Sequence, residues 1–369
     1  MDCGMCLCHA MHMDSMDIRI VDTPVGGAGK VDDWYGTGKK MDQLCQDMLN
    51  SSEWQGENPS TYEGMVTRLE MMEKAGLPRM RVISLSKLKE LGRIPRSNEG
   101  YQIDFINELK KHGNSNNMPK AVLVFFSHRW HRPNFCPEVG EDLSWGSAER
   151  QAADAAGYPV GDPDGAGHEK ALGLAELLAW FKEGKRKSSD DFLFITDDIE
   201  EIYIWIDWCC VDQTNPGPDM ATLPAYVAVC AMFVAEMNAE YETRGWCQVE
   251  VMMAKAFMTT GDKILVLEKG FRNKGQRKLT ATYADLRDPL DCNLTNPNDR
   301  AIIEKLRSVA ASSTVFTCYR VCINTSSQTL YMCCVFNVCC CCGWFGCLYL
   351  AGSRDVGPGQ GQIKKLFPI

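Results

Sequence analysis

The chain has too little positive charge for a general nucleic-acid binder. It contains 39 Lys and Arg against 48 Asp and Glu, which gives a net charge of −9. A protein that binds nucleic acid through the phosphate backbone needs a basic face. The short basic stretch at residues 182–187 is typical of a solvated loop after a helix. We therefore expect no nucleic-acid partner.

The first residues lack the features of a secretory signal. Such a signal has a basic region followed by an apolar stretch, whereas this chain starts Met1-Asp-Cys-Gly-Met-Cys-Leu-Cys. We therefore expect an intracellular protein, in the cytoplasm or on the cytoplasmic face of a membrane. There, the 19 cysteines would be reduced thiols, lipidation sites or metal ligands rather than a disulfide framework.

A phosphate-binding loop and an internal repeat are also missing. Residues 26–30 read Gly-Gly-Ala-Gly-Lys, but Pro24 stands where the loop pattern needs Gly. Val31 stands where the pattern needs the Ser or Thr that holds magnesium. No segment recurs at a fixed period, which excludes the repeat architectures.

Charge is absent from residues 321–353, and cysteine is concentrated there, with nine between Cys318 and Cys347. Residues 331–352 form an apolar run of the length that a membrane helix needs, about 20 residues. Adjacent cysteines beside such a run are targets for S-acylation. Three interpretations of residues 311–369 stay open: a membrane or acylated segment at 331–352, a buried or poorly ordered piece, and an irregular tail from an imperfect gene model.

The N-terminal part divides into a tail and a helical lead-in. Residues 1–35 show no sustained apolar period, and we expect an unstructured tail open to acylation on cysteine. Its cysteine and histidine spacings also suit a soft metal, but we expect no metal site. Residues 36–117 predict a helical lead-in, with helices near 65–75, 84–92 and 101–112.

The main domain is expected over residues 118–310. Residues 121–126 are apolar without alternation, which is typical of a strand buried on both faces of a sheet. Further strands are expected at 203–211, 231–235 and 263–267, and helices at 168–182, 224–229, 246–257, 281–287 and 299–310. Strands that alternate with helices indicate parallel βαβ units. Residues 131–167 exceed an ordinary connection, so this loop is either functional or disordered.

Polar residues follow the first expected strand directly: Ser127, His128, Arg129 and Trp130. In open α/β sheets, ligands bind at the carboxyl ends of the strands. Ser127 and Arg129 can hydrogen-bond a phosphate or ribose, and Trp130 can stack on a base or a nicotinamide ring. The alternative is that His128, Arg129 and Trp130 only cap the end of the sheet.

Asp207 is a carboxylate expected inside the second strand. Because a buried carboxylate must be paired or hydrogen-bonded, Asp207 either binds the ligand or holds the segment around Ser127 and Arg129. The neighbouring Cys209 and Cys210 are expected in the core. The spacing of His128, His131, Cys136 and His168 does not indicate a metal site.

Glu250 is the strongest candidate for a catalytic group. It shares one face of an expected helix with Trp246 and Ala254. A carboxylate partly buried beside an aromatic ring can stabilise an oxocarbenium-like centre or orient a water. The alternative is a salt bridge to Arg244 or a neighbour.

Three segments, in this order, resemble the TIR-like superfamily and, within it, the heterokaryon-incompatibility (HET) branch. Residues 123–128, Leu-Val-Phe-Phe-Ser-His, are similar to the first TIR box. Residues 203–213 resemble the HET segment Trp-Ile-Asp-x-x-Cys-Ile-Asp-Gln. Residues 244–250, Arg-Gly-Trp-Cys-Gln-Val-Glu, resemble the HET element Arg-x-Trp-x-x-x-Glu and the TIR element Trp-Cys-x-x-Glu. The resemblance covers residues 118–270.

The resemblance implies a flavodoxin-like open parallel sheet of about five strands flanked by helices. It implies that Glu250 is the catalytic carboxylate of an NAD⁺ glycohydrolase that cleaves the nicotinamide–ribose bond, with NAD⁺ as substrate and no cofactor. The nucleotide would then contact Ser127, His128, Arg129, Trp130, Asp207 and Trp246.

The alternative is a non-catalytic signalling module of defence and cell death, which associates with itself and is tethered to a membrane through residues 331–352. Two features depart from the family pattern, the long loop at 131–167 and Asn215-Pro-Gly-Pro218 in place of a Gly-rich loop.

Overall fold

The computed structural model describes residues 31–144, 146–158, 160–182, 198–213, 215–236, 240–258, 264–267 and 287–312. The expected membrane segment at 331–352, residues 1–30 and all but the last residue of the expected helix at 281–287 lie outside these ranges. Across the described ranges, no helix combines the length and the apolar character needed to cross a membrane.

Six strands form the main sheet within the described ranges. In spatial order they are β10 (Ile264–Val266), β9 (Met232–Ala235), β5 (Ala121–Ser127), β8 (Glu201–Trp205), β1 (Arg81–Ser84) and β2 (Ile103–Asp104). The first four are parallel, but β1 is antiparallel to β8 and to β2. The α/β class is confirmed, while the expectation of a wholly parallel sheet is wrong. The mixed sheet arises because β1, which carries the fully buried Val82 and Ile83, covers the open edge of β8.

The first parallel strand of the chain, β5, lies in the centre of the sheet. The chain passes from β5 to β8 on one side and then to β9 and β10 on the other. All seven residues of β5 are buried, and the Phe125 ring stacks between Trp205 and Phe233 at centroid distances of 4.6 and 5.2 Å. The connections therefore change direction between β5 and β9, and the carboxyl ends of strands at such a point commonly bind ligands.

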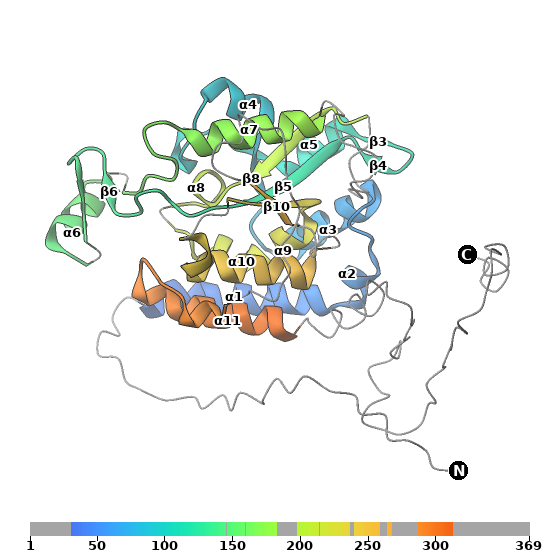
Figure 1. The fold of residues 1–369 in the computed structure, drawn as a ribbon. Helices are drawn as coiled ribbons and strands as arrows, with labels where there is room; N and C mark the ends of the chain where they lie inside the picture. The colour runs from blue at the N-terminus through green and yellow to red at the C-terminus, as the bar shows by residue number, and fades with distance from the viewer. Residues whose placement is uncertain are drawn as a thin grey trace, which may run out of the picture.

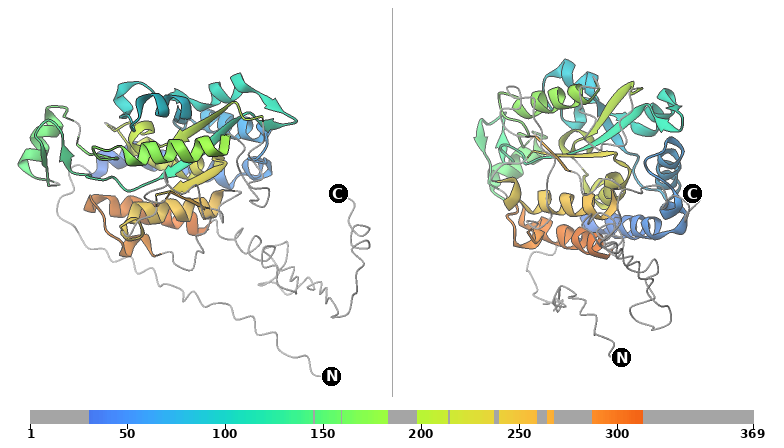
Figure 2. Two further views of the ribbon diagram at one scale, coloured as in Figure 1. Left: turned by 45° about the horizontal axis from the view of Figure 1, so that its top comes forward. Right: turned by 45° about the vertical axis from the view of Figure 1, so that its right-hand side comes forward.

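Helices cover both faces of the sheet (Figure 1). One face carries α4 (Leu85–Leu91) and α7 (Glu169–Lys182); the other carries α1 (Val31–Asn50), α9 (Gly217–Val229), α10 (Gly245–Phe257) and α11 (Arg300–Ser312). Helix α5 (Phe105–His112) packs on Tyr203 of β8. The shorter elements are α2 (Ser52–Gly56), α3 (Tyr62–Lys74), η1 (Ser97–Glu99), η2 (Tyr241–Thr243), η5 (Pro289–Asp291) and η6 (Pro297–Asp299). The views in Figure 2 show the same layers.

The lead-in and the main domain share one core. Helix α1 packs against α9, and buried Arg68 of α3 donates to the Ala228 carbonyl at 3.3 Å. Buried Asp219 of α9 accepts from Arg81 of β1 at 3.1 Å and from Tyr226 Oη at 2.9 Å. The lead-in is mostly helical, as expected, but the boundary expected at residue 118 does not separate two cores. Helix α1 also begins at Val31, inside the expected 1–35 tail.

Two local predictions are corrected. The second strand ends at Trp205, and Asp207 opens the short helix α8 (Asp207–Cys210), because the Ile206 carbonyl accepts from the backbone amides of Cys209 and Cys210 at 3.1 and 2.8 Å. Helix α9 begins at Gly217, with a proline in its first turn, rather than at Pro224. The expected strands near 231–235 and 263–267 and the helices near 168–182, 246–257 and 299–310 are present.

The long loop at 131–167 forms a small lobe that projects from the body (Figures 1 and 2). It contains β6 (Phe135–Cys136), β7 (Glu141–Asp142) and α6 (Ala148–Ala155). A separate apolar cluster fills it: Cys136, Leu143, Ala153 and Val160. The lobe follows β5 directly and therefore stands at the carboxyl end of the sheet.

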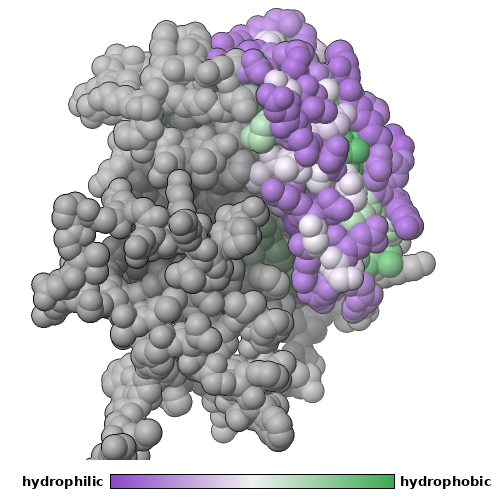
Figure 3. Space-filling view, turned by 90° about the vertical axis from the view of Figure 1, so that its right-hand side faces the viewer, coloured by the Kyte–Doolittle hydropathy of each residue, from purple (hydrophilic) through white to green (hydrophobic). Residues whose placement is uncertain are grey.

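The opposite end of the sheet carries the hairpin of β3 (Asn114–Ser115) and β4 (Met118–Pro119). Figure 3 views this end, where the described residues are mostly hydrophilic.

Candidate functional site

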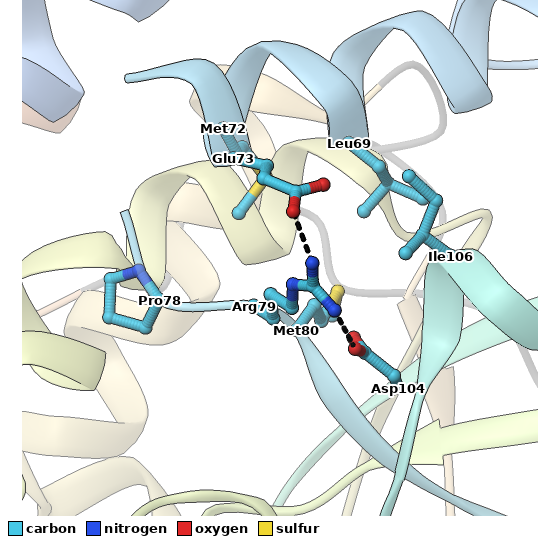
Figure 4. A pocket seen from close by; sticks show the side chains of 8 residues that line it. All are labelled: Leu69, Met72, Glu73, Pro78, Arg79, Met80, Asp104 and Ile106. Atoms are coloured by element: carbon cyan, nitrogen blue, oxygen red, sulfur yellow. Dashed lines mark hydrogen bonds and ion pairs between the residues drawn. The ribbon is translucent and has the colours of Figure 1, made fainter. Parts of the chain in front are cut away.

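Two clefts lie near β2, and none of the predicted site residues lines either of them. One is a hollow of about 10 Å³ beside Arg79, which joins Glu73 to Asp104 (Figure 4). It has room for a water at most. The other is an open cleft of about 480 Å³ lined in part by Arg81 and Asp219, which pair with each other. The predicted residues Ser127 and Glu250 meet instead at the carboxyl end of β5, where we place the candidate site.

Ser127, the last residue of β5, contacts Glu250 of α10. Its Oγ donates to Glu250 Oε2 at 2.5 Å and lies 2.6 Å from Tyr241 Oη. All three side chains are buried. A serine hydroxyl has one proton, so Tyr241 donates to Ser127 when Ser127 donates to an ionised Glu250. The structure thus joins two of the predicted site residues in one chain of hydrogen bonds.

The environment of Glu250 favours its neutral form. Burial raises the pKa of Glu250 well above its ordinary value of 4.5, and the negative charge of Asp207 raises it further. The hydrogen bond from Ser127 acts in the opposite direction and lowers this pKa. Burial also raises the pKa of Tyr241, which keeps the hydroxyl protonated.

Asp207 holds the segment that follows β5. Its carboxylate accepts from His128 Nε2 at 3.1 Å, from Trp130 Nε1 at 2.8 Å and from the backbone amide of Trp208 at 2.6 Å. Burial alone would raise the pKa of Asp207, but the charge of His128 and these hydrogen bonds lower it below its ordinary value. Asp207 and Glu250 are therefore two nearby carboxylates whose pKa values move apart, an arrangement that gives two such groups different chemical roles.

Trp130 packs inside the protein. Its ring meets the Trp208 ring edge to face at a centroid distance of 4.7 Å. Gly161, at a φ of +131°, lies against both rings, and a Cβ there would be 2.8 Å from Cζ3 of each. Only glycine combines this backbone conformation with so close an approach. The lobe thus packs, through Gly161, against Trp130 in the loop that hydrogen-bonds Asp207.

We expect Gly161→Ala to lower the free energy of unfolding by about 2–4 kcal/mol, because it combines overpacking with an unfavourable φ. Urea unfolding followed by tryptophan fluorescence measures the change. Gly157→Ala is the matched control, since Gly157 also has a positive φ but no atom lies within 4 Å of the position that a Cβ would take there. Equal losses in the two variants would show that the tryptophan contacts are unimportant.

Two ion pairs lie beside the Ser127–Glu250 contact. Arg129 pairs with Glu240, and Lys170 Nζ lies 2.9 Å from a carboxylate oxygen of Glu236. Lys170 also donates to the Arg129 carbonyl. Sequence reasoning missed Lys170, Glu236 and Tyr241. Lys170 lies in the first turn of an expected helix, and Glu236 directly follows an expected strand. Since helix starts and strand ends meet at the carboxyl edge of such a sheet, these positions could have indicated both residues as members of the site.

The other predicted residues have different partners. Trp246 Nε1 donates to Asp299 at 2.7 Å. Arg244 donates to Thr295, so Glu250 is paired with Ser127 and not with Arg244. The His128 ring stacks on Phe126 at 5.0 Å, and its Nδ1 is buried with no partner among the described residues.

Within the described ranges, no group of three or more His, Cys, Asp or Glu side chains is arranged to hold a metal ion. No protein-family model, curated protein or solved structure matches the chain. The chemical interpretation of the site therefore depends on its geometry. This geometry places two buried or half-buried carboxyl groups whose pKa values move in opposite directions, and two cations, around the carboxyl end of one central strand.

Proposed function

We propose that the carboxyl end of β5 is a TIR-like site that hydrolyses the nicotinamide–ribose bond of NAD⁺, with Glu250 as the catalytic carboxylate. The observation that carries this proposal is the contact of Glu250 with Ser127, at the point where the connections change direction. The spatial order of the four parallel strands, second–first–third–fourth in chain order, is that of flavodoxin-like sheets. This order supports the fold that the sequence resemblance implies.

Glu250 acts in its ionised form. Cleavage breaks the bond between the ribose C1′ and the nicotinamide nitrogen, and the electron pair leaves with nicotinamide. Positive charge then develops at C1′, as in other glycosyl transfers, and a nearby carboxylate stabilises it. Water adds to C1′ and releases a proton. We assign Glu250 Oε1 to the ribose, since no described residue hydrogen-bonds it, while Oε2 stays with Ser127.

Ser127 is a positioning residue in this scheme. It donates to Glu250 when the carboxylate is ionised and accepts from it when the carboxyl group is protonated. NAD⁺ carries a positive nicotinamide ring. A cation bound beside Glu250 favours its ionised form and lowers its pKa. Binding of the substrate would therefore favour the ionised, active form of Glu250.

The test is to incubate the full chain with NAD⁺ and measure nicotinamide by chromatography. We expect release that Glu250→Ala abolishes and that Glu242→Gln, a change at an exposed carboxylate nearby, leaves intact. Absence of release at every protein concentration, or equal release from Glu250→Ala, would falsify the proposal.

We expect the rate of nicotinamide release to rise with pH. Glu250 must be ionised to act, and its pKa lies well above 4.5. The rate is therefore low where Glu250 is protonated and climbs as pH passes through this raised pKa. The profile of kcat/KM against pH reports the value in the free protein. A rate that already levels off near pH 4.5 would contradict the assigned role of Glu250.

A second candidate function is a self-associating signalling module without catalysis. It is favoured by Val139 and Tyr158, two large apolar side chains on the projecting lobe that are 48% and 44% exposed. Sedimentation of the full chain and of a Val139→Ser/Tyr158→Ser variant tests it. Association of the wild type alone, without nicotinamide release, would favour this function over hydrolysis.

A further inference from the structure

The open cleft of about 480 Å³ near β2 lies at the same edge of the sheet as Ser127. Strand β1 is antiparallel to β8 and pairs Ile83 with Ile204, so Arg81 at the start of β1 lies beside the carboxyl end of β8. Ligands bind at this edge in open α/β sheets. A volume of about 300–1,000 Å³ is typical of small-molecule sites. The cleft is therefore a second candidate binding site.

Arg81 and Asp104 are neighbours in this cleft but do not pair with each other. They are directly opposite residues of β1 and β2, so their side chains lie on the same face of the strand pair. Both line the cleft. Arg81 pairs instead with Asp219, at 3.1 Å. Asp104 pairs with Arg79, at 2.9 Å (Figure 4). Two opposite charges thus lie side by side, and each is held by a different partner.

Beside Arg81, the cleft offers hydrogen-bond donors that have no acceptor. A guanidinium has several N–H donors, and within the described ranges only Nη2 of Arg81 meets an acceptor. Asn215 also lines the cleft, and its side-chain amide bonds to no described residue. The first turn of α9 lines the cleft as well, and its backbone amides have no partner inside the helix. Such a group of donors suits a carboxylate.

Beside Asp104, the cleft offers acceptors that have no donor. Asp104 Oδ1 and Gln102 Oε1 are buried without a hydrogen-bond partner in the described part of the chain, and both residues line the cleft. Buried acceptors without a donor are uncommon in folded proteins. An ammonium group supplies N–H donors together with a charge opposite to that of Asp104. Three apolar residues complete the lining: Pro78, Ile103 and Pro218.

We propose that this cleft binds a free α-amino acid with an apolar side chain. Arg81 and Asn215 hold the α-carboxylate, and Asp104 and Gln102 hold the α-ammonium. An α-amino acid carries these two groups on one carbon, which matches a basic and an acidic side chain on directly opposite residues. Its side chain packs on the three apolar residues of the lining. The site is separate from the Ser127–Glu250 contact and does not depend on the proposed hydrolysis.

Calorimetric titration of the full chain with L-leucine, L-methionine and L-valine tests the cleft. Two analogues of leucine each lack one charge, L-leucinamide the carboxylate and 4-methylpentanoate the ammonium. We expect L-leucine to bind, and each analogue to bind at least about tenfold more weakly, because it loses a charged hydrogen-bonded contact. Absence of binding by all three amino acids, or equal affinities for L-leucine and L-leucinamide, overturns the inference.

Asp104→Asn isolates the contact with the ammonium. It keeps the shape of the side chain and should weaken binding of L-leucine at least about tenfold. It should not weaken binding of 4-methylpentanoate, which has no ammonium. Glu73→Gln is the matched control, because Glu73 also pairs with Arg79 but does not line the cleft. It changes the net charge by the same amount and should bind L-leucine like the wild type.

Arg81→Lys isolates the contact with the carboxylate. Lysine can still pair with Asp219, but it lacks the planar fork that binds a carboxylate. We expect weaker binding of L-leucine and unchanged binding of L-leucinamide. Thermal unfolding verifies that each variant is folded, and Asp104→Asn keeps the test valid if Arg81→Lys is not. Equal affinities of wild type and Asp104→Asn for L-leucine, or an equal loss in Glu73→Gln, contradict the assigned contacts and overturn the inference.

Discussion

Replacing Glu250 by Gln is expected to abolish nicotinamide release and, at neutral pH, to make the protein more stable. Gln keeps the shape and can still accept from Ser127, but it has no charge to stabilise the developing cation. Loss of such an electrostatic contribution typically lowers kcat by about 100-fold or more. The gain in stability arises because Gln avoids the cost of ionising a buried carboxyl group.

The sign of the pH dependence follows from the raised pKa. The unfolded chain loses the Glu250 proton near pH 4.5, whereas the folded chain keeps it to a higher pH. Between these values the folded state binds more protons than the unfolded state, so the free energy of unfolding falls as pH rises. The slope for one proton is at most about 1.4 kcal/mol per pH unit. In Glu250→Gln, this pH-dependent contribution to the free energy of unfolding is absent.

Denaturant unfolding at several pH values measures the effect. The stability advantage of Glu250→Gln should be absent below pH 4.5, grow with pH and then level off. Glu242→Gln, at an exposed carboxylate, should show neither the loss of activity nor the gain in stability. A Glu250→Gln protein that is less stable than the wild type at neutral pH would show that the ionised carboxylate contributes to the folded state.

A chain that starts at residue 118 is expected not to fold. It lacks β1, whose backbone pairs with β8, and α1, which packs against α9. The edge of β8 would be open, and the Arg81 partner of buried Asp219 would be missing. Removing one partner from a buried, hydrogen-bonded charge costs about 3–5 kcal/mol. This loss alone is a large part of a typical folding free energy, and the exposed apolar surface adds to it.

Thermal unfolding and limited proteolysis of residues 118–369 test this expectation. We expect no cooperative transition and rapid digestion. A chain of residues 31–369 serves as the control, because it retains every core contact of α1 and β1, and it should unfold cooperatively. A cooperative transition of residues 118–369 near that of the full chain would instead establish the domain boundary that the sequence indicates.

The elements around the site were largely predictable. Residues 121–126 form a buried strand because a run of apolar, β-branched and aromatic side chains has few other ways to leave water. Residues 246–257 form a helix in agreement with the local spacing of Trp246, Glu250 and Ala254 on one helical face. The rule that strand ends and helix starts converge at one edge then places Glu250 near Ser127, and the structure shows these side chains 2.5 Å apart.

Other features depend on contacts that no local pattern contains. The short strand β1 is visible only through its pairing with β8. The apolar residues after Trp205 continue a strand pattern, yet the chain turns into α8. There the Asp207 carboxylate accepts from the backbone amide of Trp208 and from His128 and Trp130 in the loop after β5. A single sequence does not indicate such a convergence of hydrogen bonds.

The sequence by itself determined the α/β class, the buried strand at 121–126 and the candidate site residues Ser127 and Glu250, which meet at the end of that strand. These depend on apolar periodicity and strand ends, which are local properties of the chain. Only the tertiary structure decided that β1 completes a mixed sheet, that burial raises the pKa of Glu250, and that Glu236 pairs with Lys170. Burial and charge pairing depend on segments that are distant in the chain, and folding alone brings those segments together.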